Sequence, residues 1–346
     1  MKTRRIGYLN DPKTAVEEAA NIVRRGGTVA FPTETVYGLG ALGLDPEALR
    51  KIFLAKERPR SDPLILHVVE PSWLGRLAAE LMPSARALTG ALWPGPLTLV
   101  VTKSSRVPDL ATADLPSVAV RMPSGQVALE LMEAVGEPVA APSANRFGRP
   151  SPTTADHVLE DLDGRIDAVL DAGPTEVGME STVLDIRADP PRILRPGAVT
   201  REEIEQELGF SIQSMETGRT CLPSAAVSPG QLDRHYSPRA RMHLFSGDEE
   251  KMPERMVCAV EKAARGLKVG VLAYENDLPH LQHLPVTLRL LGRRDDPKSC
   301  ARRLFSALRE LDSAGVEAIY ARLTIPRGMG QAINDRLLRA ASGRTE

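Results

Sequence analysis

The alternation of apolar and polar positions predicts an α/β chain with two separate sets of helices and strands. In the first set, apolar residues recur at helical spacing over 12–25, 45–56 and 201–208. Short runs of β-forming residues predict strands at 28–31, 64–69, 97–102, 117–122, 138–141, 168–171 and 181–186. This mixture predicts one strand-rich α/β domain.

The second set follows a segment of different composition. Residues 211–238 are rich in Ser, Thr, Pro and Gly and show no sustained periodicity, which is typical of a linker. Beyond them we expect helices at 253–265, 299–312 and 331–341 and strands at 268–274, 285–290 and 316–323. Such alternation predicts a small parallel sheet with covering helices. The predicted organisation is a first domain at 1–210, a linker or lid at 211–238 and a second α/β domain at 239–346.

The composition of the chain excludes some classes of protein but does not indicate a function. The chain has 346 residues, 42% hydrophobic and 26% charged, with a formal net charge of −1, so no global attraction to nucleic acid or anionic membrane is expected. We find neither an apolar run of the ~18 residues that a membrane helix needs nor the apolar core of a signal peptide. The 3 cysteines are far apart, which favours a reducing cytoplasm over a disulfide framework.

Familiar nucleotide and hydrolase signatures are missing from the sequence. There is no G-x-x-x-x-G-K-[ST], H-E-x-x-H or G-x-S-x-G, and no G-x-G-x-x-G follows a predicted strand. If this protein handles phosphates, we expect side chains to do so.

The segment KERPRSDP, at 56–63, is the first candidate for that chemistry. Lys56 and Arg58 are one residue apart on a turn stiffened by Pro59 and Pro63. An ammonium beside a forked guanidinium suits a polyphosphate, and a fixed backbone loses less entropy when an anion binds. The alternative is a solvated basic turn at a helix end.

Two other polar segments adjoin predicted strands. APSANRFGRPSP, at 141–152, places Ser143 and Asn145 beyond the end of a strand, where ligands bind in open α/β sheets. FPTETVYGLG, at 31–40, runs from a strand into a polar turn followed by glycines that permit close backbone approach. Each also has an ordinary interpretation, as a self-capping turn and as a hairpin, respectively.

Two aromatic side chains are open to structural interpretations as well. By pattern alone, His67 at the end of an apolar strand is more typical of a core histidine than of a catalyst. Tyr236, in the predicted linker, is equally consistent with packing of the linker onto a domain.

Taken together, these segments resemble the YrdC-type threonylcarbamoyl-AMP synthases. The matching pieces run in the family's order over about 15–205: FPTETVYGLG, the K-x-R-P turn with PLILHV, SVAVRMPS, APSANRFGRPSPT, ESTVLDI and ILRPGAV. SPGQLDRHYSP and GMGQAINDRLLRAAS are similar to the longer branch of the family, which has a C-terminal domain. The resemblance implies a twisted mixed-sheet domain with a large positively charged cavity, plus a smaller Rossmann-like α/β domain.

The resemblance also implies a reaction. Such enzymes use L-threonine, bicarbonate and ATP with Mg²⁺, release pyrophosphate, and supply threonylcarbamoyl-AMP for modification of the adenosine beside the tRNA anticodon. Transient contact with tRNA or with the downstream threonylcarbamoyl transferase is also implied, and no membrane partner. Threonine's amine must form a carbamate, whose oxygen then attacks the α-phosphate, so positioning and positive charge are the main needs.

Roles carry over from the motifs to matching positions. The resemblance assigns threonine binding to Thr35, His67, Arg121, Ala141 through its backbone, and Ser181. It assigns ATP binding to Lys56, Arg58, Asp62, Ser117, Ser143, Asn145, Ser151, Arg195 and Tyr236, with Lys56 and Arg58 as the catalytic cations. No protein metal ligand is assigned. Arg121 is the natural partner of a carboxylate, and Tyr236 predicts that the linker folds back as a lid.

One position departs from the family pattern. Asp62 stands where the family usually has asparagine. An anion at this place repels a triphosphate unless it faces Mg²⁺ or a cation.

Two alternatives were weighed against the synthase. An RNA-binding module without catalysis fits a basic concave sheet, but aromatic residues are only 4% of the chain and net charge is close to zero. A carbamoyl-transfer domain acting on another acceptor predicts zinc-type cysteine clusters, which the sequence lacks.

Overall fold

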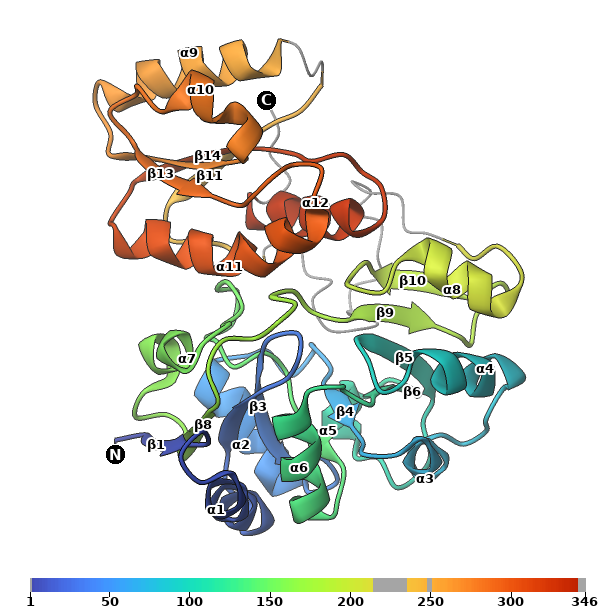
Figure 1. Ribbon diagram of the computed structural model, residues 1–346. Helices are drawn as coiled ribbons and strands as arrows, with labels where there is room; N and C mark the ends of the chain where they lie inside the picture. Colours follow the sequence, from blue (N-terminus) through green and yellow to red (C-terminus); the bar gives the residue numbers. More distant parts are fainter. Residues whose placement is uncertain (1, 214–234, 248–250, 342–346) are drawn as a thin grey trace. The chain divides into compact units, whose positions relative to one another are not determined.

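The computed structural model describes residues 2–213, 235–247 and 251–341, and it divides into two compact units (Figure 1). The first unit comprises Met1–Phe147 and Ser151–Gln231, and the second comprises Gly148–Pro150 together with Leu232–Glu346. A three-residue piece of the loop 141–152 thus belongs to the second unit. The predicted linker and lid fall mainly on residues outside the described part, so that prediction stays untested.

The first unit is built on one mixed sheet of ten strands within the described residues. The strands are β1 (Arg4–Gly7), β2 (Val29–Pro32), β3 (Tyr37–Leu42), β4 (Ile65–His67), β5 (Leu97–Thr102), β6 (Ser117–Arg121), β7 (Val139–Ala140), β8 (Ala168–Asp171), β9 (Thr182–Asp185) and β10 (Arg192–Arg195). Their order is β1-β8-β2-β3-β7-β4-β6-β5-β9-β10, with parallel and antiparallel pairs. The predicted α/β class with a mixed sheet is confirmed.

Helices cover both faces of this sheet. They are α1 (Pro12–Arg24), α2 (Pro46–Lys56), α3 (Leu74–Leu77), α4 (Pro83–Leu92), α5 (Asp109–Thr112), α6 (Gln126–Val135), α7 (Ala155–Leu162) and α8 (Arg201–Leu208), with a short 3₁₀ turn at Pro71–Trp73. Val29 and Phe31 pack into the cluster that holds α1 and α6, whereas Ala30 packs into the other cluster with α2. This alternation follows from the two-residue period of a strand and buries both faces.

Capping side chains mark the starts of two helices of the first unit. The Asp45 side chain accepts a hydrogen bond from the amide of Glu47 at 2.8 Å, and Pro46 occupies the first turn of α2. Thr200 and Glu203 form a reciprocal capping box at the start of α8. These caps fix where each helix begins, and α2 ends at Lys56 because Glu57 adopts the left-handed conformation, with φ 54°.

The segment 31–40 forms a hairpin with its polar residues in the turn. β2 and β3 pair antiparallel, with Phe31 opposite Gly38. A Cβ on Gly40 would lie 2.6 Å from the Phe31 ring, so only glycine fits there. The segment is therefore a hairpin, and the turn of that hairpin is polar and buried.

The second unit contains a four-stranded sheet that is parallel throughout its described residues. Its strands are β11 (Arg241–Phe245), β12 (Val269–Ala273), β13 (Thr287–Leu290) and β14 (Ala318–Arg322), in the order β11-β14-β12-β13. Its helices are α9 (Met252–Ala264), α10 (Leu278–Leu281), α11 (Pro297–Ser313) and α12 (Met329–Ala340), with a 3₁₀ turn at Glu275–Asp277. The predicted small parallel sheet is confirmed.

The second sheet is also covered on both faces. α9 and α10 pack on one face, and α11 and α12 lie on the other (Figure 1). A Cβ on Gly270 would lie 2.9 Å from Leu311, so β12 approaches α11 closely. In the part of the chain that the structure describes, no helix combines the length and apolar character needed to cross a membrane.

Candidate active site

Three strands of the first sheet place polar side chains in one row. His67 pairs with Arg121 across β4 and β6, and Arg121 pairs with Thr98 across β6 and β5. Directly paired residues point to the same face of a sheet, so these three side chains are neighbours. All are buried, at 2%, 4% and 0% exposure for His67, Arg121 and Thr98, respectively. A buried row of this kind needs partners, because unpaired polar groups are costly.

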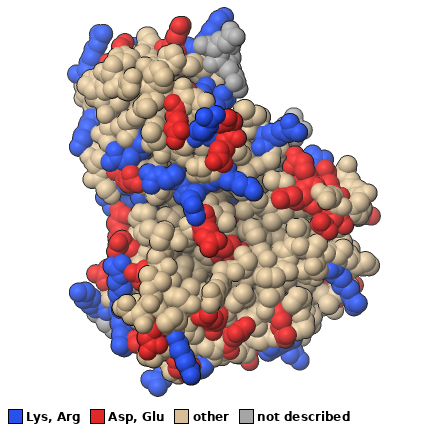
Figure 2. Space-filling view, viewed as in Figure 1, with Lys and Arg blue, Asp and Glu red and all other residues tan. Residues whose placement is uncertain are grey.

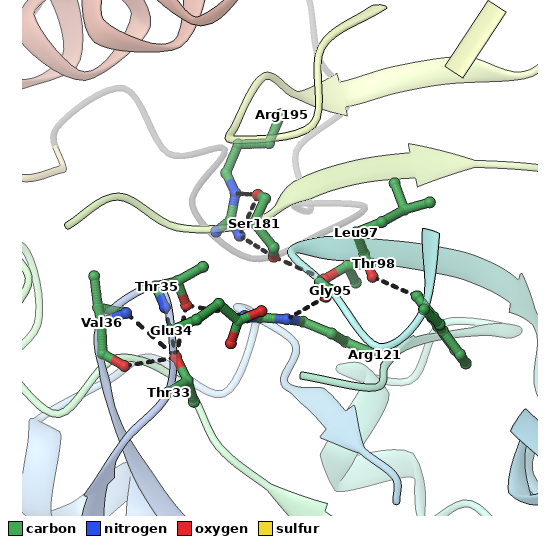
Figure 3. A network of polar contacts seen from close by, with 11 residues as sticks. Thr33, Glu34, Thr35, Val36, Gly95, Leu97, Thr98, Arg121, Ser181 and Arg195 are labelled. Carbon is green, nitrogen blue, oxygen red and sulfur yellow. Dashed lines mark hydrogen bonds and ion pairs between the residues drawn. The ribbon is translucent and has the colours of Figure 1, made fainter. Parts of the chain in front are cut away.

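The β2–β3 turn supplies partners for Arg121 (Figure 3). Its guanidinium donates to the Thr35 hydroxyl at 3.1 Å, pairs with a Glu34 carboxylate oxygen at 2.7 Å and donates to the Gly95 carbonyl at 3.3 Å. The Thr33 hydroxyl lies 2.7 Å from that of Thr35 and donates to the Val36 carbonyl at 2.8 Å. The polar turn is therefore fixed internally and aimed at Arg121.

Charge in this cluster is set by burial and by Arg121. Burial by itself raises the pKa of Glu34, but the charge of Arg121 and its hydrogen bonds outweigh burial and lower the pKa below its ordinary value. Burial, with a smaller contribution from Arg121, lowers the pKa of His67 to about 3. Glu34 is therefore an anion and His67 a neutral imidazole at physiological pH, which leaves one compensated cation in the cluster.

Ser181 immediately precedes β9 and lies on the same face of the sheet as Thr98. Its hydroxyl lies 2.8 Å from the Thr98 hydroxyl, next to Arg121 in the row. The Arg195 guanidinium donates to the Ser181 carbonyl at 3.0 Å and to its hydroxyl at 3.2 Å (Figure 3). The structure thus brings together four of the five residues assigned to threonine, namely Thr35, His67, Arg121 and Ser181.

Lys56 lies against the loop 141–152. Its ammonium donates to the main-chain carbonyls of Ser143 and Asn145, the latter at 2.5 Å. The Phe147 amide donates back to the Lys56 carbonyl at 2.8 Å, and Lys56 is 1% exposed. The cation at the end of α2 and the predicted phosphate-binding loop are therefore one assembly.

Arg58 and Asp62 form a buried ion pair. The Arg58 guanidinium lies 2.9 Å from a carboxylate oxygen of Asp62 and donates to the main-chain carbonyls of Asp62 and Pro63 at 3.1 and 2.7 Å. Asp62 is fully buried. The aspartate that departs from the family pattern thus faces a cation, which is the condition under which it avoids repelling a phosphate.

The remaining predicted residues occupy several places. Ser117 lies on the same strand as Arg121, four positions earlier, so the two share a face of β6. The Ala141 amide donates to the Ile65 carbonyl at 3.1 Å beside β4. The Ser151 hydroxyl bonds a carboxylate oxygen of Glu180, next to Ser181 in sequence.

Tyr236 belongs to the second unit. Its ring stacks on Phe305 at 5.4 Å between centroids, and Arg336 lies over it at 5.0 Å. The assignment of Tyr236 to ATP remains a prediction.

Sequence reasoning missed two members of the network, Glu34 and Thr98. Glu34 was visible as an acid inside an otherwise apolar and hydroxyl-rich hairpin, a pattern that indicates a buried counter-ion. Thr98 could be found only from strand register, because its place beside Arg121 and Ser181 depends on how β5 pairs with β6.

Comparison with protein-family models accounts for almost the entire chain. The model Sua5_yciO_yrdC, described as "Telomere recombination", matches residues 21–197. A second model, described as "Threonylcarbamoyl-AMP synthase, C-terminal domain", matches residues 199–342. The two matches meet close to the predicted start of the linker.

Whole-chain relatives agree with the family models. The chain is 43% identical to a protein of Pyrococcus abyssi named "Threonylcarbamoyl-AMP synthase", over 94% of this chain and 93% of that protein. It is 41% identical to a Bacillus subtilis protein of the same name, over 97% of this chain and 94% of that one. Among solved structures, one described as P. abyssi Sua5 complexed with L-threonine matches with a TM-score of 0.92 and 40% identity, covering 100% of this chain and 99% of that one.

Proposed function

Because this chain belongs to the threonylcarbamoyl-AMP synthase family, we propose that it makes threonylcarbamoyl-AMP from L-threonine, bicarbonate and ATP for tRNA modification, releasing pyrophosphate. One observation carries the proposal. Thr35, Arg121 and Ser181, which the motifs assign to threonine, are linked through Thr98 and strand register into one buried network. The similarity to a structure described as complexed with L-threonine supports that assignment.

Arg121 is proposed to bind the threonine carboxylate. Thr35, Glu34 and Gly95 hold its guanidinium in place, so little entropy is lost when a carboxylate binds. His67 is neutral and adds no second positive charge beside Arg121, so it contributes hydrogen bonding to this pocket. The threonine hydroxyl is left to Ser181 and its neighbour Thr98.

The chemistry then has two steps. In the first, the threonine amine attacks the carbon of CO₂ formed from bicarbonate, and the amine proton leaves to water, which gives a carbamate. In the second, a carbamate oxygen attacks the α-phosphorus of ATP, and the bond to the β-phosphate breaks with its electrons going to pyrophosphate. Lys56 and Arg58 are proposed to offset the charge that develops on the phosphoryl oxygens, so they raise the rate by electrostatics and positioning.

Mg²⁺ is proposed to enter as the ion of ATP. The carboxylates at the predicted ATP end, Asp62 and Glu180, are oxygen donors of the kind that Mg²⁺ prefers, but Arg58 and Ser151 engage them. Among the described residues, no group of three or more His, Cys, Asp or Glu is arranged to hold a metal. When bound with ATP, the ion would share the charge of the phosphates.

A reaction with all components tests the proposal. Purified protein is incubated with ATP, L-threonine, bicarbonate and Mg²⁺, and pyrophosphate and threonylcarbamoyl-AMP are measured by a coupled assay and mass spectrometry. We expect both products together, and neither when threonine or bicarbonate is left out. Pyrophosphate release that ignores either co-substrate, or no adenylate at all, would contradict the proposal.

A pair of lysines on α2 provides a matched comparison for the same assay. Lys56→Met removes the buried ammonium and is expected to lower kcat by about a hundredfold or more, since one preorganised charge is lost. Lys51→Met removes an exposed lysine that binds the Gly26 carbonyl, and kcat should stay within about twofold of wild type. Equal kcat in the two variants would remove Lys56 from the mechanism.

Membership of an enzyme family favours this function over an RNA-binding module without catalysis. On the face drawn in Figure 2, cations and anions are interspersed, and acidic side chains gather over α8, which reads REEIEQEL. A broad basic surface for a phosphate backbone is therefore not what this face offers.

A further inference from the structure

One face of α11 in the second unit carries three buried side chains of different chemistry. Phe305, Arg309 and Asp312 are spaced four and three residues apart, so they line up along one side of the helix. Their exposures are 0%, 1% and 7%, respectively. We call these three residues the α11 face. Burying an arginine and an aspartate is costly unless both have well-placed partners.

The partners of the α11 face come from two segments that are far apart in sequence. Arg309 donates to the Pro150 carbonyl at 2.6 Å, and Asp312 lies 3.4 Å from the Arg149 guanidinium. Asp312 also accepts the amide of Arg239 at 2.8 Å.

The segment that contains Tyr236 reaches the same face. Tyr236 lies three residues before Arg239 in the chain, and its ring stacks on Phe305. The Ser237 amide donates to the Gly148 carbonyl at 2.7 Å, so the two segments also bond each other directly. The α11 face therefore holds residues 148–150 and 236–239 in one fixed arrangement.

Residues 148–150 lie inside the loop that carries predicted ATP ligands. Asn145 precedes them and holds the Lys56 ammonium through its carbonyl, and Ser151 follows them and bonds Glu180. A residue spans at most ~3.6 Å of chain. Residues 148–150 therefore cannot shift far without moving the residues beside them. The position of the loop's middle thus constrains both of its ends.

We propose that the α11 face positions residues 148–150 and, through them, the loop 141–152 to which ATP-binding residues are assigned. Arg309 and Asp312 are positioning residues in this proposal, because they act through Arg149 and Pro150 rather than through a substrate. The inference rests on the proposed function for the identity of the ligand. It predicts a larger effect on ATP than on threonine, because Ala141 is the only residue assigned to threonine that lies in this loop, and its amide is held by the Ile65 carbonyl.

Full-length Arg309→Met is the main test. Loss of one buried hydrogen bond to the loop is expected to raise the KM for ATP by about tenfold, while the KM for threonine stays within about twofold. Arg309→Lys keeps the charge and one donor, so it should recover part of the loss. Arg303→Met is the matched control on the same helix: Arg303 is exposed, pairs with Glu310, and should leave both KM values unchanged.

Hydrogen exchange provides a readout that does not need catalysis. In wild type, Arg309→Met, Asp312→Asn and the Arg303→Met control, exchange is followed in peptides covering 143–153 and 236–241 by mass spectrometry. We expect faster exchange in both peptides for Arg309→Met and Asp312→Asn, and wild-type exchange for Arg303→Met. The reason is that the Ser237 amide loses its fixed partner when the loop is released.

The two measurements separate this inference from the proposed function. A wild-type KM for ATP and wild-type exchange in both Arg309→Met and Asp312→Asn would overturn the inference. If wild-type protein made no threonylcarbamoyl-AMP, the proposed function would fail instead, and faster exchange in the variants would still support the hold on the loop. If Arg309→Met does not fold, Arg309→Lys and Asp312→Asn decide the question by the same criteria.

Discussion

Each unit of this protein ends a buried strand with an arginine that pairs with a carboxylate. Arg121 ends β6 and pairs with Glu34 at 2.7 Å, and Arg322 ends β14 and pairs with Asp277 at 2.6 Å. Both arginines are buried, at 4% and 5% exposure. Both pairs thus join a buried arginine at a strand end to a buried carboxylate.

What differs is how the donors are shared. Arg322 directs Nε and a terminal nitrogen at the one carboxylate of Asp277, and the Tyr274 ring lies 5.9 Å away. Arg121 instead divides its donors among the carboxylate of Glu34 and two neutral oxygens. In our proposal, the donors that Arg121 directs at neutral oxygens turn to the carboxylate of threonine, whereas Arg322 directs the donors named here at Asp277 alone. The comparison teaches that two buried arginines can differ in the arrangement of their partners alone, and this difference is what our proposal for Arg121 uses.

The largest expected effect comes from Arg121→Met. We expect kcat/KM for threonine to fall by about a thousandfold, equivalent to about 4 kcal/mol, because the proposed partner of the substrate carboxylate is lost. The fold is checked by circular dichroism, because the substitution also leaves Glu34 buried without its counter-ion. Adding Glu34→Gln should restore stability without restoring threonine use. Recovery of kcat/KM in that double variant would mean that Arg121 only balances Glu34.

Arg322→Met should produce the opposite pattern. Breaking a buried pair leaves Asp277 as an uncompensated charge and is expected to cost about 3 kcal/mol of unfolding free energy in the second unit. We expect the KM for threonine to stay within about twofold of wild type. Urea unfolding and steady-state kinetics measure the two quantities. A large rise in KM with unchanged stability would reverse the roles given to the two arginines.

A smaller effect concerns His67, the neighbour of Arg121 in the row. Its pKa is about 3 in the folded protein, well below the ~6.5 of an unfolded histidine. Above about pH 6.5 the side chain is neutral in both states, so its stabilising contribution is complete. As the pH falls from about 6.5 towards 3, the unfolded chain takes up a proton that the folded chain does not, and stability declines by up to ~1.4 kcal/mol per pH unit.

The test of this pH dependence is His67→Gln. Between about pH 6.5 and 5, the unfolding free energy of the variant should fall less steeply than that of wild type, by up to about one proton's worth of slope. Urea unfolding at several pH values provides the slopes. Identical slopes would show that His67 titrates alike in the folded and unfolded chain, contrary to its burial.

Much of the fold could be predicted from sequence, and the failures have physical causes. The bounds of β5, β8 and α8 match their predictions, because β5 and β8 are short runs of mostly apolar residues and α8 ends at a glycine. β3 was treated as part of a turn, since Gly38 and Gly40 lower strand propensity; close packing against Phe31 and Ala141 overrides that preference. The edge strands β1, β10 and β11 were missed because their charged residues dilute the apolar pattern.

The site could be predicted in part. Motifs pointed to Thr35, Arg121 and Ser181, and the structure shows them in one network. They could not show that Lys56 is bound by main-chain carbonyls, since carbonyls leave no trace in residue identity. The motifs also could not show the partner of Asp62. Its pairing with Arg58 depends on how the turn 58–62 folds, which residue types alone do not specify.

The assignment of Gly148–Pro150 to the second unit has a consequence for modularity. No single cut in the chain separates the two units, because a fragment that ends before the linker keeps this tripeptide and removes the Pro150 carbonyl from Arg309 and the Arg149 guanidinium from Asp312. A chimaera built from two homologues must exchange the tripeptide along with the C-terminal half. The tripeptide and its partners on α11 therefore form one structural module, although more than 150 positions of sequence lie between Pro150 and Arg309.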